Sequence, residues 1–239
     1  LNPGCFPYLV EPRPGPAFAG AAPEIVAARE GGRFHATAVA GTVPDSEDPA
    51  EQAELARQLL ESPKDRVEHE IGVRDMRRAL AEAAGVAEVD EEPRVLRLRG
   101  LQHLLTNVSA DVPRGLHVLE LLEAMHPTAA VNGTPRDEAR AFLRRWEPFD
   151  RGWYAGPVGW FDAGGDGEFA PALRCALLRG RQALLLSGAG VVRGSDPARE
   201  WEETALKLGP ALEALGLDPE AEVDAVRAAP REAPGLRSR

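Results

Sequence analysis

Short apolar runs, broken by glycine, proline and aspartate, fill residues 18–42 and again residues 153–192. Such a pattern is typical of strands joined by tight turns. We expect two strands that meet at Glu30-Gly31-Gly32, and a later series of hairpins between Trp153 and Ser187. Consecutive hairpins pair antiparallel, so both stretches predict antiparallel sheet.

Between these stretches the apolar residues recur at helical spacing, and residues 94–108 return to a strand-like run. The expected helix starts share a polar capping residue followed by proline. They are Ser46 or Asp48 before Pro49, Ser62-Pro63, Thr134-Pro135 and Ser195-Asp196-Pro197. A short helix is also expected over residues 116–125, Gly85 should end the second helix, and Gly209-Pro210 should end the last.

Strands first, helices between and hairpins near the end predict an α+β fold rather than alternating βαβ units. One domain should span residues 1–216, and residues 217–239, rich in Ala, Pro, Glu and Arg, should form a disordered tail.

Composition narrows the class of protein. The net charge of −10, without a stripe of Lys and Arg, argues against a nucleic-acid partner. No run approaches the ~20 apolar residues of a membrane span, and the start lacks a signal-peptide pattern, so we expect a cytoplasmic protein without a membrane partner. Cys5 and Cys175 stand alone and are expected to be plain thiols.

Two features could bind an anion. On a strand over residues 172–176, Arg174 would share a face with Ala172 and Ala176, which leaves room before its guanidinium for a ligand carboxylate. The alternative is an arginine on a solvent-exposed strand. The run Gly188-Ala189-Gly190 could bring backbone N–H groups to an anion, or could only make a turn.

Acidic residues offer a candidate metal site. Glu68 lies on the second predicted helix, and Glu203 lies on the last, four residues before Lys207. If these helices converge, their carboxylates would suit a hard cation such as Mg²⁺. Otherwise Glu203 and Lys207 form only an i,i+4 surface ion pair of small energy. The five histidines lack the spacing of metal ligands.

Longer motifs carry a more specific signal. The chain resembles the chorismate-utilising enzymes, with the greatest likeness to isochorismate synthases of menaquinone or siderophore pathways. The likeness covers roughly residues 2–216 and rests on these runs, in order: GAAPE at 20–24, AGT at 40–42, KDRVEH at 64–69, QHL at 102–104, HPTAAVNGTPR at 126–136, EPFDRGWYAG at 147–156, GAGVV at 188–192 and SDP at 195–197.

The resemblance implies a layered α+β fold, with antiparallel sheets at its core and helices packed outside them. For the activity, it implies Mg²⁺-dependent conversion of chorismate to isochorismate, an isomerase reaction in which water adds at C2 and the C4 hydroxyl leaves. It also implies roles for particular residues. Glu24 would be the general acid, Glu68 and Glu203 would be the metal ligands, and the substrate would contact Gly41, Thr42, His103, Tyr154, Arg174, Gly188 and Lys207.

The sequence departs from the family pattern in two ways. Ala22 replaces the serine that precedes the Pro-Glu of the acid motif. The family's base is a lysine on an upstream strand, whereas Lys64 and Lys207 belong to other motifs. We therefore expect the domain to be incomplete at its N-terminus and inactive alone, with the base supplied by an N-terminal segment or a complementing chain.

Three alternatives remain open at this stage. The chain could belong to an anthranilate synthase or a salicylate synthase of the same family, or it could be a non-catalytic chorismate-binding module.

Overall fold

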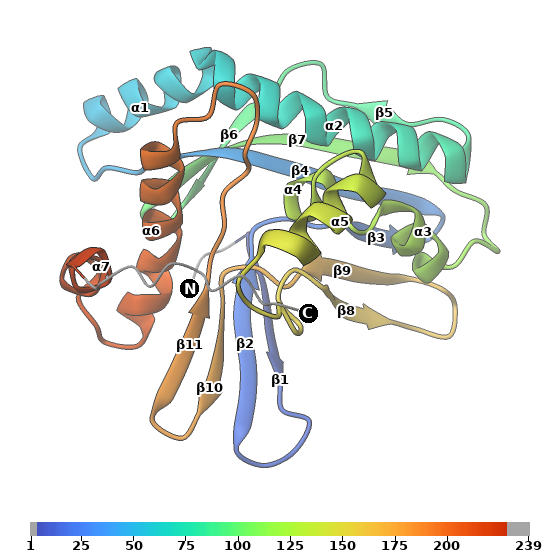
Figure 1. The fold of residues 1–239 in the computed structure, drawn as a ribbon. Helices are drawn as coiled ribbons and strands as arrows, with labels where there is room; N and C mark the ends of the chain where they lie inside the picture. The colour runs from blue at the N-terminus through green and yellow to red at the C-terminus, as the bar shows by residue number, and fades with distance from the viewer. Residues whose placement is uncertain (1–3, 229–239) are drawn as a thin grey trace.

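A computed structural model describes residues 4–228 of the protein (Figure 1). Its strands are β1 (Phe6–Val10), β2 (Pro16–Ala22), β3 (Ala27–Glu30), β4 (Arg33–Pro44), β5 (Glu88–Val89), β6 (Arg94–Leu98), β7 (Leu101–Asp111), β8 (Pro157–Phe161), β9 (Gly167–Pro171), β10 (Cys175–Arg179) and β11 (Gln182–Leu186). Its helices are α1 (Pro49–Glu61), α2 (Pro63–Ala84), α3 (Val118–Met125), α4 (Ala129–Asn132), α5 (Arg136–Trp146), α6 (Pro197–Ala214) and α7 (Pro219–Ala228).

The strands form two sheets in which neighbouring strands run antiparallel. The smaller sheet has the order β1-β2-β10-β11. The larger has the order β5-β7-β4-β3-β9-β8, with β6 also paired to β7. The chain passes between the sheets twice, from β2 to β3 and from β9 to β10. The predicted α+β fold with antiparallel sheets is confirmed.

Helices α1 and α2 lie across one face of the larger sheet, as Figure 1 shows. The main core lies between that face and helices α2 and α3, and it contains Phe34, Met76, Leu80 and Leu121. His69 of α2 is buried there, with its Nε2 2.7 Å from the hydroxyl of Thr106. Burying these apolar side chains provides most of the driving force for folding, at roughly 1.5–3 kcal/mol for each large one.

A smaller apolar cluster joins the two sheets where the chain passes between them. Its buried members are Tyr8, Phe18, Ala22, Ala170, Ala172 and Cys175. The Tyr8 hydroxyl donates a hydrogen bond to the Leu173 carbonyl at 2.9 Å. This cluster fixes the β9–β10 connection, which carries Arg174.

The predicted helix starts and stops are largely as the structure has them. The side chains of Asp48, Ser62 and Asp196 each accept a hydrogen bond from a backbone N–H in the first turn of their helix. Gly85 ends α2 with φ 92°. Local capping chemistry therefore predicts these boundaries well.

Other details differ from the prediction. Thr134 does not cap α5, whose N-cap is Pro135 without a side-chain hydrogen bond. Helix α6 does not end at Gly209-Pro210 but runs through Pro210 to Ala214. Proline removes one helical hydrogen bond, but burial of Leu212 one turn from the helix end favours its continuation. The strand-like run 94–108 is a hairpin, with Gly100 at φ 76° in its turn.

The predicted disordered tail also differs in its first part. Residues 219–228 form helix α7, which packs on α6. Asp218 begins it, because its side chain accepts the backbone N–H of Glu220 at 3.0 Å, and Pro219 has no N–H to satisfy. Composition outweighed this capping signal in the prediction. Residues 229–239 lie outside the described part of the chain.

Candidate active site

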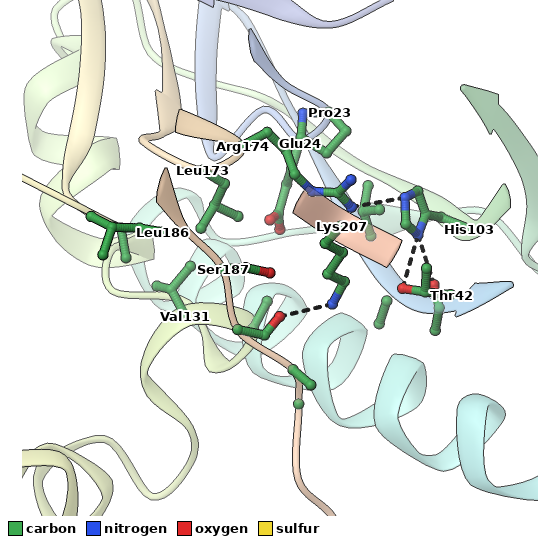
Figure 2. A pocket seen from close by; sticks show the side chains of 18 of the residues that line it. Pro23, Glu24, Thr42, His103, Val131, Leu173, Arg174, Leu186, Ser187 and Lys207 are labelled. Carbon is green, nitrogen blue, oxygen red and sulfur yellow. Dashed lines mark hydrogen bonds between the residues drawn. The ribbon is translucent and has the colours of Figure 1, made fainter. Parts of the chain in front are cut away.

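A cavity of about 130 Å³ lies where the two sheets, α2, α4 and α6 meet (Figure 2). Every site residue predicted above except Glu203 lines it: Glu24, Gly41, Thr42, Glu68, His103, Tyr154, Arg174, Gly188 and Lys207. Glu203 is buried directly behind this lining, where it contacts Thr42 and Lys207. The fold thus gathers residues that are up to 183 positions apart in the sequence, from Glu24 to Lys207.

Gly41 and Thr42 reach the cavity through a bulge in β4. The register of β4 against β7 shifts between Ala40 and Val43, and Gly41 has φ 69°. Inserted residues of this kind re-aim the backbone and the side chains next to a site. Here the Gly41 carbonyl points to His103, and the Thr42 hydroxyl donates to Glu203 Oε1 at 3.2 Å.

Arg174 lies between strands, not on one. It has φ 50° in the gap between β9 and β10, so the period-two argument for its direction was wrong. This left-handed conformation, unusual for arginine, is held where the Arg174 carbonyl accepts the N–H of Ala21. The side chain still enters the cavity, as Figure 2 shows.

The Arg174 guanidinium has an unusual partner. Its Nη2 donates to Nε2 of His103 at 3.0 Å, and within residues 4–228 no carboxylate forms an ion pair with it. Burial lowers the pKa of Arg174 to about 10, so the group stays cationic at neutral pH. A cavity-facing cation with unused N–H donors is suited to bind an anionic ligand.

His103 is neutral and holds one tautomer. Burial, together with the charge of Arg174, lowers its pKa to about 3. Because arginine can only donate, Nε2 must accept from Arg174, and the imidazole proton must lie on Nδ1. That nitrogen donates to the Gly41 carbonyl at 2.8 Å. His103 therefore links the β4 bulge to Arg174 rather than titrating.

Glu24 is a buried acidic residue at the cavity. It follows Pro23 in the β2–β3 connection, its side chain is 2 % exposed, and its Oε1 has no hydrogen-bond partner in the described structure. Desolvation raises its pKa to about 8. The carboxyl is therefore protonated at neutral pH and can donate a proton into the cavity.

A cluster of three carboxylates and two ammonium groups joins α2 to α6. The Lys64 Nζ lies 2.9 Å from Glu68 Oε2, 3.0 Å from Glu200 Oε1 and 3.9 Å from Glu203 Oε2. The Lys207 Nζ lies 2.5 Å from Glu203 Oε1 and donates to the Gly188 carbonyl at 3.0 Å. Helices α2 and α6 thus converge, as the metal hypothesis required, and Glu203 is buried rather than a surface residue.

The glycine run packs tightly against this cluster. A Cβ on Gly190 would lie 2.1 Å from Glu68 Oε1, and one on Gly188 would lie 3.1 Å from the Tyr154 hydroxyl. A side chain at Gly190 would therefore displace the Glu68 carboxylate, and one at Gly188 would push the Tyr154 hydroxyl by a few tenths of an ångström. At Gly188 it is the carbonyl, bonded to Lys207, that the structure places at the cavity.

Two participants in the cluster had no role in the sequence-based site. The sequence motifs assign no role to Glu200, yet it is buried and its Oε2 has no hydrogen-bond partner in the described residues. Lys64 was seen only as part of a motif. Its i,i+4 spacing to Glu68 was the available signal, but that spacing alone is typical of surface pairs.

No preformed metal shell exists in the described part of the chain, where no three His, Cys, Asp or Glu side chains group as metal ligands. The Lys64 ammonium lies among the carboxylates instead. Residues 4–228 also contain no helix that is long and apolar enough to cross a membrane.

Comparison with known proteins shows the family of the chain. Residues 1–216 match the family model described as "Chorismate binding enzyme". The chain therefore belongs to the chorismate binding enzyme family, and the resemblance found in the motifs is confirmed.

Particular relatives are more informative about the branch of the family. The chain is 43% identical to the salicylate biosynthesis isochorismate synthase of Pseudomonas aeruginosa, over 84% of this chain and 43% of that protein. It is similar to the structure of MenF, the menaquinone-specific isochorismate synthase of Escherichia coli, with TM-score 0.80 and 36% identity over 90% of this chain and 49% of that one.

A second branch is more distant. Anthranilate synthase component I of Streptococcus pneumoniae gives TM-score 0.73 and 27% identity over 85% of this chain and 45% of that one. The chain spans about half the length of these relatives, or somewhat less.

Proposed function

We propose that this chain forms the chorismate-binding part of an isochorismate synthase, an isomerase that adds water at C2 of chorismate and expels the C4 hydroxyl. The observation that carries the proposal is Glu24, a buried carboxyl protonated at neutral pH that lines the same cavity as the cationic Arg174. The names of the similar proteins support isochorismate rather than anthranilate as the product.

The reaction needs a proton donor for the leaving hydroxyl and a cationic group that binds a substrate carboxylate. The leaving C4 hydroxyl needs a proton, which Glu24 holds below pH 8. A substrate carboxylate needs a planar pair of donors, which Arg174 offers. Lys207, Tyr154, Thr42 and the Gly41 and Gly188 backbone shape the remaining wall. His103 acts by fixing Arg174, because its imidazole is neutral.

The carboxylate cluster fits Mg²⁺ by its chemistry. Oxygen ligands from one or two carboxylates, completed by water and substrate oxygens, are what this cation takes in proteins. Glu68 and Glu203 would hold it, with the unpaired Glu200 Oε2 close by. Bound there, Mg²⁺ would neutralise and orient a carboxylate of the substrate.

The water that attacks C2 must lose a proton, and the described cavity offers no obvious base for it. Both lysines of the sequence are engaged by carboxylates. A lysine contributed by an N-terminal segment or a complementing chain, as the sequence predicts, remains our proposal for the base.

The test measures substrate binding and turnover separately. Chorismate binding is measured by calorimetry on the 239-residue chain in Mg²⁺. Turnover is followed by NMR spectroscopy with the chain in its whole reading frame. We expect chorismate to bind and isochorismate to be the product. Salicylate or anthranilate as the product would place the protein in another branch, and binding without turnover would make it a non-catalytic module.

A further inference from the structure

Lys64 is placed where a metal ion is expected. It lies in the first turn of α2, and its ammonium contacts carboxylates of both α2 and α6: Glu68 at 2.9 Å and Glu200 at 3.0 Å, with Glu203 at 3.9 Å. Two of these carboxylates, Glu68 and Glu203, are the metal ligands of the proposed function. A lysine that bridges two helices through three buried or nearly buried carboxylates is unlike a surface ion pair.

We propose that Lys64 is a built-in counter-cation, which holds the carboxylate cluster together in the metal-free protein and which a divalent cation must displace. The inference rests on the metal site of the proposed function and adds a competitor to it. It explains why three carboxylates converge without forming a ligand shell in the described residues.

The charges make the two cations exclusive. Glu68, Glu200 and Glu203, with Asp65 3.7 Å from the Lys64 ammonium, bring four carboxylates together, and Lys64 and Lys207 supply two positive charges. Removing a cation from a buried group of carboxylates is costly, so the metal-free cluster needs Lys64. A divalent cation on the same oxygens would repel an ammonium at contact distance, and the oxygens cannot serve both fully.

Lys64 can leave without moving the backbone, and Lys207 is less free to do so. The Lys64 side chain is 25% exposed and has a four-carbon stem at a helix start, so its ammonium can swing into water. The Lys207 ammonium is also bonded to the Gly188 carbonyl and its side chain is 16% exposed. Lys64 is therefore the displaceable partner, and it acts as a positioning residue.

The first experiment measures metal affinity without substrate. Mn²⁺, which loses its free-ion electron paramagnetic resonance signal on binding, is titrated into the native chain, Lys64→Met and the control Arg66→Met. Arg66 is a cation on the same helix that pairs with Glu92 on the surface. We expect Lys64→Met to bind Mn²⁺ on the order of tenfold more tightly than the native chain, and Arg66→Met to bind like the native chain. Native-like affinity in Lys64→Met would overturn the proposal.

A second experiment needs no variant, because Lys64→Met could fail to fold when three carboxylates lose their counter-cation. The native chain is acylated briefly in EDTA and in saturating Mg²⁺, and Lys64 modification is measured by mass spectrometry against the chain's amino terminus. Displacement into water should raise Lys64 labelling in Mg²⁺. Unchanged or lower labelling would contradict it.

The outcomes also separate this inference from the proposed function. Suppose that Mn²⁺ binds, that Lys64→Met binds it no more tightly than the native chain, and that Lys64 labelling does not rise in Mg²⁺. Then Lys64 does not compete with the metal, but the metal site of the proposed function stands. If neither the native chain nor Lys64→Met binds Mn²⁺, the metal site is wrong and the competitor with it. Chorismate binding measured in EDTA would then still test the substrate assignment.

Discussion

Glu24 shows how a single buried residue links stability to pH. A carboxyl with a raised pKa favours the folded state fully below its unfolded pKa, 4.5, and loses this contribution as the pH rises through its folded value of about 8. Replacing Glu24 by Gln removes that loss. The difference in melting temperature, Glu24→Gln minus native, should therefore grow from pH 4.5 to about 8 and then level off.

The effect at high pH corresponds to at most about 5 kcal/mol, as each pKa unit is worth roughly 1.4 kcal/mol. Thermal unfolding followed by circular dichroism at a series of pH values measures it. The exposed Glu123→Gln on α3 is the control and should show no such trend. If the difference in melting temperature between Glu24→Gln and the native chain does not depend on pH, then the pKa of Glu24 is not raised and its carboxyl is ionised at neutral pH.

Arg174 should depend on the shape of its guanidinium as well as its charge. Arg174→Lys keeps a cation, but a single ammonium cannot make two parallel hydrogen bonds to a carboxylate or donate at the same time to His103. We expect chorismate affinity to fall by about 2–5 kcal/mol, measured by calorimetry. Arg179→Lys, at the exposed end of β10, is the matched control. Equal affinities in both variants would contradict a substrate contact at Arg174.

The same residue marks a limit of sequence interpretation. Alternation over residues 172–176 predicted a strand, but the chain changes sheet there, with Leu173 N–H bonded to the Pro171 carbonyl and Arg174 at φ 50°. Local alternation cannot reveal such a change, because it is set by the tertiary cluster of Tyr8, Phe18 and Cys175. The resemblance to the family identified Arg174 correctly as a cavity residue, although the strand argument for it was wrong.

At the scale of elements, the bulge in β4 is the feature on which the site is built. Gly41 combines φ 69° with close neighbours, since a Cβ would lie 3.0 Å from Asp65 Cβ and 3.1 Å from Leu59 Cδ1. Gly100 has a similar φ of 76° in the β6–β7 turn, where a Cβ would have no neighbouring atom within 4 Å in the described structure. Comparing Gly41 with Gly100 therefore separates the cost of backbone strain, which both share, from the cost of crowding, which only Gly41 has.

We expect Gly41→Ala to cost more stability than Gly100→Ala. The left-handed conformation alone costs roughly 1–2 kcal/mol for a residue with a Cβ, and this part is common to both variants. Crowding against α1 and α2 should add about 1–3 kcal/mol at Gly41 only. Urea unfolding of both variants gives the difference. Equal losses would mean that α1 and α2 can shift to accept the methyl group.

Element boundaries were predictable where the signal is local, and not where packing decides. Asp48, Ser62 and Gly85 mark their helix ends through short-range hydrogen bonds or backbone conformation. Pro210 is a local stop signal that the buried Leu212 overrides in α6. In helix α7 the local signal was right and the prediction was wrong. Asp218-Pro219 is a helix start, but the prediction of a disordered tail relied on the composition of the segment instead.

For the whole molecule, pattern alone gave an α+β class but not the order of strands or the cavity. The larger sheet places β3, β4 and β9 side by side, although β9 follows β4 by more than a hundred residues. Such long-range pairing brings Glu24 to Arg174 and α2 to α6, and no periodicity encodes it. Motif resemblance supplied these associations, because the family motifs fall on the segments that line the cavity.

The convergence of α2 and α6 gives the prediction that depends on the whole fold. Glu203 is buried, 7% exposed, and paired with Lys207, while Glu68 approaches from the other helix. If both hold Mg²⁺, chorismate should bind much more tightly in Mg²⁺ than in EDTA, because the metal neutralises a substrate carboxylate. Glu203→Ala should strongly weaken that dependence, because it removes one of the two carboxylates proposed to hold the cation.

Calorimetric titrations of chorismate in Mg²⁺ and in EDTA test this for the native chain, Glu203→Ala and Glu202→Ala. Glu202 is the exposed glutamate one position earlier on α6, so its variant matches the change in charge and helix propensity. Glu202→Ala should keep the metal dependence of the native chain. If the native chain binds chorismate equally well in Mg²⁺ and in EDTA, then binding does not require the cation. Glu203 would then be only the partner of Lys207 and Thr42, and not a ligand of a required Mg²⁺.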